Sequence, residues 1–328
     1  MTVLVLLAPS AAARTQQLIV IGVPGIPPAF LGIRSYVASD RHLYAKFLGR
    51  TATAGIRDFT TDSDAIQALQ SGQIDLAWVS TPVALAAMAK GAPLVGIEGM
   101  SSTDWEIDST DPAISSCAAL KGQMIGVDEV GGARYDALVV MLSECKLTIS
   151  DVKTVDLPPS TGMGALVAGQ LTLNVDHLDE ARQVQALTGK AVTVVLKLSD
   201  IDPYQHFELL VTTREKLAAN RALFVKILKG DIAAASWLAD AKNLAAGAAI
   251  AQITGDSASV AGDAITTYLR ANWWNAGESG LTVQRITRTL GLGLRLGIIP
   301  PAGASLSWQT VVDTSLWHDA SASCCRTP

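Results

Sequence analysis

The chain has 328 residues, enough for about two domains of ordinary size. Hydrophobic residues make up 49% of it and charged residues 17%, which excludes a disordered or coiled-coil protein. The formal net charge of −5 argues against a nucleic-acid partner, because binding to phosphates requires a basic face. No apolar run approaches the ~20 residues that a membrane-spanning helix needs.

The first thirteen residues read MTVLVLLAPSAAA and predict a signal peptide over residues 1–13. In this segment an apolar stretch is followed by the small residues that a signal peptidase prefers. The stretch is short, and no Lys or Arg precedes it; a start codon assigned too far downstream would explain both. We therefore expect an exported protein. A cytosolic protein with an apolar N-terminal strand is the alternative.

Short strands alternate with helices along the first two thirds of the chain, which predicts mostly parallel sheets covered on both faces. Residues 18–23 read as a buried strand. Asp62 or Ser63 can cap a helix that Gly72 ends, and residues 74–79 form the next strand. From residue 213 onward the sequence turns helical and rich in alanine.

An internal echo suggests two lobes of similar topology. The stretch ALQSGQIDL, residues 68–76, recurs as ALVAGQLTL, residues 165–173. Upstream of each copy, Ile-Gly-Val occurs at residues 21–23 and 125–127. The two echoes come in the same order at similar spacing. We therefore expect two related lobes, each with a buried strand that feeds a glycine-containing loop and a helix.

The chain contains four cysteines, Cys117, Cys145, Cys324 and Cys325. None forms a CxxC pair, and no set of histidines accompanies them, which argues against a zinc site. Cys117 precedes a predicted strand and Cys145 ends the helix after it, so a disulfide between them is possible in an oxidising compartment. Two small buried thiols are the alternative.

Ligands on such sheets bind at the loops that follow the carboxyl ends of parallel strands. This rule nominates two loops in each half of the chain. They are residues 24–30 and 79–82 in the first half, and 128–134 and 176–180 in the second. If the strand ends of both lobes face each other, they form a cleft at the domain interface, where small ligands commonly bind.

Several stretches resemble the periplasmic substrate-binding proteins of the nitrate, sulfonate, taurine and thiamine-pyrimidine-precursor group. They are IGVPGIPPAF from Ile21, IQALQSGQIDLAWVSTPVALAAMAKGAPL from Ile66, LKGQMIGVDEVGGARYDAL from Leu120, ALVAGQL from Ala165, the Trp-Trp segment at Asn272 and SLWHDA at Ser315. The stretch at 40–58 and the sequence DHLDE, residues 176–180, depart from the pattern of that group. The departures bear on the ligand more than on the fold.

The resemblance implies the type II periplasmic-binding-protein fold, an α/β architecture of two lobes with mixed, mostly parallel sheets, a hinge and a helical C-terminal part. We expect lobe I over residues 18–100 plus 207–318, lobe II over 101–206 and a flexible tail over 319–328. The resemblance further implies a monomer in the periplasm without cofactor or metal. It would bind a small-molecule solute and deliver it to an ABC permease in the inner membrane.

The candidate ligand-binding residues all lie in or near the four loops or the return crossing between the lobes. They are Pro27, Phe30, Ser80, Thr81, Gly131, Gly132, Arg134, His177, Asp179, Glu180, Tyr204 and His206. The glycines let the backbone approach an oxygen atom, and Arg134 could grip a carboxylate or sulfonate in two places. His177, Asp179 and Glu180 suit an amine, an amide or a ring nitrogen. Ordinary helix capping, turns and core packing are the alternatives for each.

The expected function is therefore solute binding by hinge closure, with a small organic anion or a heteroaromatic nutrient as ligand. An enzyme is the alternative, because some relatives with this fold form the pyrimidine of thiamine. Those enzymes carry a Cys-rich motif within the fold, whereas Cys324 and Cys325 lie in the last five residues. The sequence has no GxSxG, HExxH or GxxxxGK[ST] motif, and we expect no catalysis.

Overall fold

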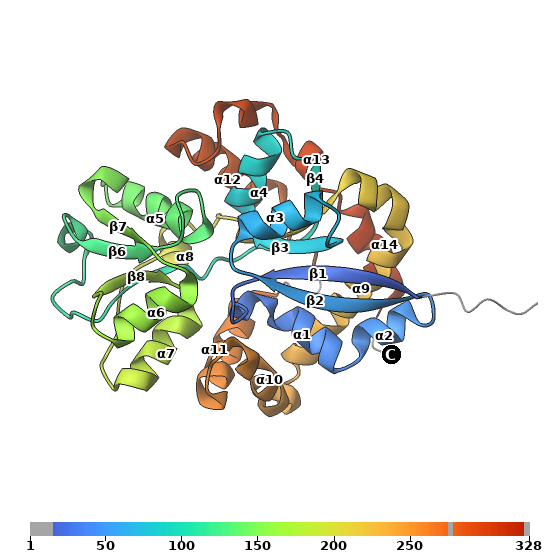
Figure 1. The fold of residues 1–328 in the computed structure, drawn as a ribbon, viewed down its shortest axis with the longest axis horizontal. Helices are drawn as coiled ribbons and strands as arrows, with labels where there is room; N and C mark the ends of the chain where they lie inside the picture. Colours follow the sequence, from blue (N-terminus) through green and yellow to red (C-terminus); the bar gives the residue numbers. More distant parts are fainter. Residues whose placement is uncertain (1–15, 275–277, 325–328) are drawn as a thin grey trace, which may run out of the picture.

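The computed structural model describes residues 16–274 and 278–324. The expected signal peptide, residues 1–13, lies outside the described residues. Figure 1 shows two lobes side by side, each built on its own sheet. No helix in the described ranges is long and apolar enough to cross a membrane.

Lobe I holds a five-stranded sheet in the order β2-β1-β3-β10-β4. Strand β1 pairs in parallel with β2 and β3, and β10 runs antiparallel to β3 and β4. The bounds are β1 Gln17–Pro24, β2 Ala52–Phe59, β3 Leu76–Ser80, β4 Leu94–Met100 and β10 Glu208–Thr213. Because helices cover both faces, β3, β4 and β10 are buried along their whole length.

Lobe II holds a second five-stranded sheet in the order β7-β6-β8-β5-β9. Its strands are β5 Glu106–Ser109, β6 Met124–Val127, β7 Lys153–Asp156, β8 Leu173–Asp176 and β9 Thr193–Lys197. All five lie within the range expected for lobe II. The chain enters this lobe through residues 101–105 and returns through residues 198–207, so two segments join the lobes.

The two sheets have the same topology when matched in order, β2 with β7, β1 with β6, β3 with β8, β10 with β5 and β4 with β9. In each sheet the fourth strand comes directly after a crossing and runs antiparallel to its neighbours. Both also show a register shift against the last strand, at Leu210/Val211 and at Ile107/Asp108. This shared order explains the repeated sequence, since the echo covers β1 and β6, and then the helix–strand units that end in β3 and β8.

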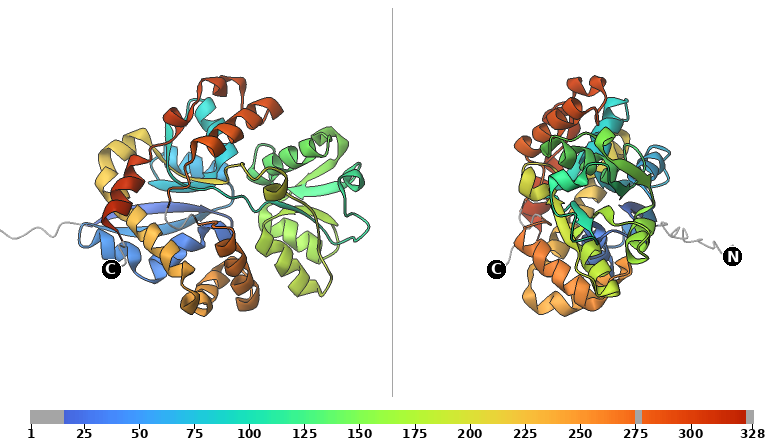
Figure 2. Two further views of the ribbon diagram at one scale, coloured as in Figure 1. Left: turned by 180° about the vertical axis from the view of Figure 1, so that it is seen from behind. Right: turned by 90° about the vertical axis from the view of Figure 1, so that its left-hand side faces the viewer.

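Most helices belong to lobe I, and those of residues 214–323 wrap its sheet (Figure 2). The lobe I helices are α1 Ile33–Asp40, α2 Leu43–Leu48, α3 Asp62–Gln70, α4 Thr81–Ala89, α9 Arg214–Ala239, α10 Leu244–Ala251, α11 Ala258–Arg270, α12 Val283–Leu296, α13 Trp308–Val311 and α14 Ser315–Ser323. Those of lobe II are α5 Ala133–Glu144, α6 Pro159–Val167, α7 Leu178–Thr188 and α8 Leu198–Ile201.

Local sequence explains several helix boundaries. Helix α3 begins near Asp62 as expected, but the capping residue is Thr61 and not Asp62 or Ser63, because the Thr61 side chain accepts a hydrogen bond from the Asp64 N–H. The long helix expected after residue 213 breaks at Asp240, whose backbone is extended. Gly230 does not break α9, because its missing side chain leaves room for Tyr44 of α2. A Cβ atom at Gly230 would lie 2.4 Å from the Tyr44 ring.

Two expectations about the ends and the cysteines are resolved by the fold. We expected a flexible tail from residue 319, but α14 continues to Ser323, with Ala320 buried and Asp319 accepting a 2.7 Å bond from Arg221. Burial of one helix face therefore orders the first part of that segment. Cys117 and Cys145 form a disulfide, which ties the turn before β6 to the end of α5.

Candidate functional site

A cleft with a volume of about 770 Å³, open to solvent, lies between the two lobes. Lobe I contributes the loops after β1 and β2, the first residue of β10 and the turn before α11. Lobe II contributes the loops after β6, β7 and β8, and the first crossing contributes Trp105. The cleft therefore lies at the carboxyl ends of parallel strands from both sheets, as the sequence predicted for three of the four nominated loops.

Two aromatic rings, those of Trp105 and His177, line the cleft, and further aromatic side chains pack near them. The rings of Trp105 and His177 stack with centroids 3.9 Å apart, and Phe207 contacts both rings edge-on. On the lobe I side, Tyr268 stacks on Trp273 at 3.9 Å. This packing fixes the orientation of His177, so its ring can serve as a rigid wall for a flat solute.

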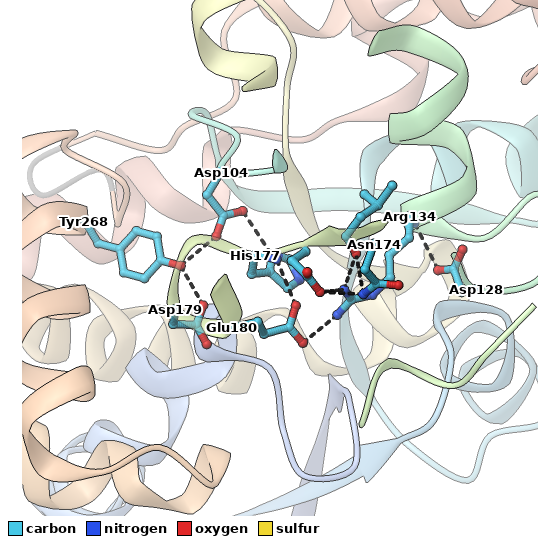
Figure 3. A network of polar contacts seen from close by, with 10 residues as sticks. Asp104, Asp128, Arg134, Asn174, His177, Asp179, Glu180 and Tyr268 are labelled. Carbon is cyan, nitrogen blue, oxygen red and sulfur yellow. Dashed lines mark hydrogen bonds and ion pairs between the residues drawn. The ribbon is translucent and has the colours of Figure 1, made fainter. Parts of the chain in front are cut away.

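A polar network around His177 joins both lobes and the first crossing (Figure 3). His177 Nδ1 lies 3.0 Å from Asp104 Oδ1. Burial by itself lowers the pKa of His177, but the nearby Asp104 carboxylate outweighs it, and the pKa lies above its usual value. The Tyr268 hydroxyl lies 2.7 Å from Asp104 Oδ2 and 2.9 Å from Asp179 Oδ1.

One hydroxyl proton cannot serve two carboxylates, so one of the two acids must itself carry a proton. Burial, with Asp256 nearby, raises the pKa of Asp179 well above its usual range. The Tyr268 hydroxyl forms hydrogen bonds with both acids and so links Asp104 to Asp179. Because Tyr268 lies on α11 of lobe I and Asp179 on α7 of lobe II, this chain of bonds holds the two lobes together.

Arg134 lines the cleft, but acceptors of its own lobe occupy its guanidinium group (Figure 3). Nη2 donates to Glu180 Oε1 at 2.7 Å, while Nη1 donates to the Val175 main-chain oxygen and lies 3.4 Å from Asp176 Oδ1. The Arg134–Glu180 pair lowers the pKa of Glu180 below its usual value despite burial. The cation is therefore neutralised within lobe II and is not free to grip an anionic solute.

The helix N-termini at the cleft are also occupied by side-chain acceptors. Asp128 accepts bonds from the N–H groups of Arg134 and Tyr135 at the start of α5. Glu180 accepts from the His177 N–H at the start of α7, at 2.8 Å. An oxoanion normally takes such N–H groups, so these internal carboxylates compete directly with it.

Six carboxyl groups line the cleft against one arginine and one histidine; they are Asp62, Asp128, Asp179, Glu180, Glu208 and Asp256. Three of them, Asp62, Glu208 and Asp256, belong to lobe I. Burial raises the pKa of Asp62 to about 7, even though its Oδ2 accepts a 2.8 Å bond from the Ser80 N–H. Burial also raises the pKa of Glu208 well above its usual range. The lining therefore offers a solute mainly carboxyl groups, and few cationic groups that could pair with an anion.

The structure brings together five of the twelve candidate residues at the cleft: Pro27, Arg134, His177, Asp179 and Glu180. Two others, Ser80 and His206, line a smaller cavity of about 300 Å³ between the crossings and α5. Phe30, Thr81, Gly131, Gly132 and Tyr204 line neither cavity.

The reasons for these differences are local. Thr81 Oγ1 lies 2.7 Å from His206 Nδ1, and His206 Nε2 lies 2.9 Å from the Gly280 oxygen, so both side chains serve the packing of lobe I. Burial lowers the pKa of His206 to about 4, which keeps the ring neutral. Gly132 leaves room for the Asp128 carboxylate, since a Cβ atom there would lie 2.6 Å from it. Phe30 packs on Tyr268, and Tyr204 is exposed.

Sequence reasoning missed Trp105, Glu208 and Asp256 as cleft residues. Trp105 and Glu208 flank the two crossings, whose ends we placed only approximately. The positions of the four nominated loops gave no information on the crossings or on the turn before α11. Within the described residues, no group of three or more His, Cys, Asp or Glu side chains is placed to hold a metal ion.

These features define a two-lobed α/β protein with the fold of the periplasmic binding proteins. A family model described as "NMT1/THI5 like" matches residues 55–241, more than half of the chain, and the chain belongs to this family. No curated protein matches the sequence.

Solved structures share the fold over nearly the whole chain. The alkanesulfonate-binding protein SsuA from Xanthomonas axonopodis pv. citri, bound to MOPS, is 17% identical with a TM-score of 0.73, covering 92% of this chain and 99% of its own. The periplasmic nitrate-binding protein NrtA from Synechocystis PCC 6803 is 14% identical with a TM-score of 0.74, covering 97% and 91%. The ligand-binding component of an ABC-type import system from Staphylococcus aureus is 16% identical with a TM-score of 0.74, covering 93% and 99%.

Proposed function

We propose that this protein is the solute-binding component of an ABC importer. It holds one small molecule between its lobes and delivers it to a permease in the inner membrane. The observation that carries this proposal is the cleft itself, which both sheets line with the ends of matched strands. Similar structures described as binding components of import systems support it.

Hinge closure is the mechanism. Contacts of α7 with α11 and with the turn before it form only when the lobes approach; they are Arg182 to Thr267 at 3.0 Å and Gln183 to the Gly255 oxygen at 2.6 Å. A solute that touches both lobes adds to these contacts and shifts the population toward the closed form. The protein acts as a monomer in the periplasm, where the Cys117–Cys145 disulfide is chemically stable.

Of the two solute classes expected from the sequence, the cleft favours a heteroaromatic nutrient over a small organic anion. Arg134 and the helix N-termini already have internal acceptors, and carboxyl groups dominate the lining. Stacked aromatic side chains offer a flat apolar wall, and the acids offer acceptors for ring and amino N–H groups.

Isothermal titration calorimetry with purified protein, residues 16–328, against separate panels of pyrimidines, sulfonates, nitrate and aromatic carboxylates tests this function. We expect a single site, a raised melting temperature and a smaller radius of gyration for one heteroaromatic compound. The Asp179→Ala variant, which removes the hydrogen bond to Tyr268, should bind it more weakly, and the exposed Gln185→Ala variant on the same helix should not. Absence of binding by every panel would contradict the function.

We also propose that the protein binds without turnover. The pyrimidine-forming enzyme is the alternative, and mass spectrometry of the panel compounds after incubation with the protein separates the two. Recovery of every compound unchanged supports a binding protein, whereas a product that requires intact protein supports the enzyme.

A further inference from the structure

Strands β5 and β10 directly follow the two crossings, and each of them begins with a glutamate. The two glutamates occupy equivalent places in the two sheets. Glu208 begins β10 and lies opposite Ser80 and Met100. Glu106 begins β5 and lies opposite Asp176 and Lys197. Both side chains are buried. The repeated architecture therefore offers an internal comparison of one acid in two environments.

The two glutamates differ in whether a cation faces them. Glu106 Oε1 lies 3.1 Å from Lys197 Nζ, so lobe II neutralises its acid internally. The equivalent neighbour of Glu208 is Met100, which carries no charge. Glu208 is 1% exposed, and its Oε2 atom has no hydrogen-bond partner among the described residues. A buried acid without a partner is costly, and natural proteins retain few of them without a function.

Glu208 differs from Glu106 in a second respect, since it lines the interlobe cleft and Glu106 does not. Its charged neighbours are Asp62 of α3 and Asp104 of the first crossing, both acids. His177, which also lines the cleft, is bound to Asp104 through its Nδ1 atom. Among the described residues Glu208 forms no ion pair with a lysine, arginine or histidine side chain, while the cleft gives a solute access to it.

We propose that the bound solute carries a positive charge on a group with N–H donors, and that Glu208 pairs with this group as Lys197 pairs with Glu106. This inference rests on the proposed solute-binding function and specifies the charge of its ligand. Amidinium and protonated aminoheterocyclic groups fit, because they are flat and present two N–H donors to a carboxylate. Asp62 is close enough to raise the pKa of Glu208, and its ionised form would add to the attraction for a cation.

Binding is then linked to proton release. Burial raises the pKa of Glu208, which favours the protonated form of the acid when no cation is bound. The bound cation favours the carboxylate form, so the proton leaves to the buffer. Binding should therefore tighten as the pH rises, with release of a proton when the solute binds.

Benzamidine, benzamide and benzoate provide the test, because they have nearly the same shape but charges of +1, 0 and −1 at neutral pH. We expect benzamidine to bind at least about tenfold more tightly than benzamide, and benzoate to bind most weakly. Calorimetry in phosphate and in Tris should give different heats for benzamidine, which reports the released proton.

Matched variants assign the effect to Glu208. Glu208→Gln should weaken benzamidine binding at least about tenfold and abolish proton release, while unliganded protein melts at the same or a higher temperature. Glu106→Gln makes the same change in the other sheet and should leave benzamidine binding within about threefold. Met100→Lys should also weaken benzamidine binding, because it supplies the internal cation that Lys197 provides in lobe II.

Three results would overturn the assignment. They are binding of benzamide or benzoate as tight as that of benzamidine, unchanged benzamidine binding by folded Glu208→Gln, and failure of all three probes while a neutral or anionic compound of the nutrient panels binds. Each of these leaves the solute-binding function standing. Failure of the three probes and of every nutrient panel would overturn both.

Discussion

Arg182 of α7 donates a 3.0 Å hydrogen bond to Thr267 Oγ1 of α11, and this bond bridges the two lobes outside the cleft. Thr267 Oγ1 also donates to the Asp263 oxygen of its own helix. The bond therefore contributes to lobe closure without touching a solute. A variant that lacks this bond therefore tests the free energy of lobe closure without changing the residues that contact the solute.

Replacing Thr267 with valine should weaken solute binding by about fivefold, because one hydrogen bond contributes about 1 kcal/mol to the closed form. The radius of gyration of the unliganded protein, measured by small-angle scattering, should rise. Thr266→Val is the matched control, since Thr266 Oγ1 bonds only to Gly262 of its own helix among the described residues. Equal effects of the two variants would show that the bridge does not stabilise closure.

Arg134 should be required for stability more than for charge recognition. Its removal in Arg134→Ala leaves Glu180 and Asp176 buried without their cation, which should cost about 3–5 kcal/mol in the free energy of unfolding. Urea denaturation measures this loss, and Arg57→Ala, at an exposed site of β2, should cost less than about 1 kcal/mol. A stable Arg134→Ala protein that has lost binding of an anion would instead favour a direct role in gripping oxoanions.

The fold was largely predictable because it depends on patterns that recur along the chain. Glycine stops at residues 72 and 169 and the repeated strands at 21–23 and 125–127 carry the topology, and the structure matches them sheet by sheet. Each signal is local, so a single sequence is enough to read it. The expectation that two crossings join the lobes was based on the resemblance to the periplasmic binding proteins.

The site was less predictable because its residues acquire their roles from partners far away in the sequence. The sequence around Arg134 gives no sign of a partner for its charge. Only the fold places Glu180, 46 residues away, against it. Glu208 gives no local signal, since its significance lies in the absence of a lysine at the place of Met100. Loop positions predicted where the cleft lies, but its charge could not be read from them.

The stability of the unliganded protein should fall as the pH rises from 6.5 to 8. Burial raises the pKa of Asp62 to about 7 and that of Glu98 to about 8, so the folded state holds protons that the unfolded state has already released. Below pH 6.5 His206 acts in the opposite sense, because burial lowers its pKa to about 4 and the unfolded state then binds the extra proton.

Asp62→Asn should make the pH dependence between 6.5 and 8 shallower, since asparagine can still accept the Ser80 N–H bond but does not titrate. Urea denaturation at several pH values measures the slope. Asp64→Asn, an exposed change on the same helix, should leave the slope as it is in the unmodified protein. A free energy of unfolding that stays constant or rises over this range would show that Asp62 is ionised in the folded protein.

The Cys117–Cys145 disulfide should stabilise the protein without influencing the cleft. The two cysteines are separated by 28 positions, and a crosslink across a loop of that size lowers the entropy of the unfolded chain by an amount equivalent to about 3–4 kcal/mol. The double variant Cys117→Ser/Cys145→Ser should lose roughly this much, and dithiothreitol should lower the melting temperature of the unmodified protein but not of the variant. Because neither cysteine lines the cleft, solute affinity at 25 °C should change by less than about twofold. If the variant and the unmodified protein melt together in the absence of reductant, the two cysteines are unbridged thiols in solution.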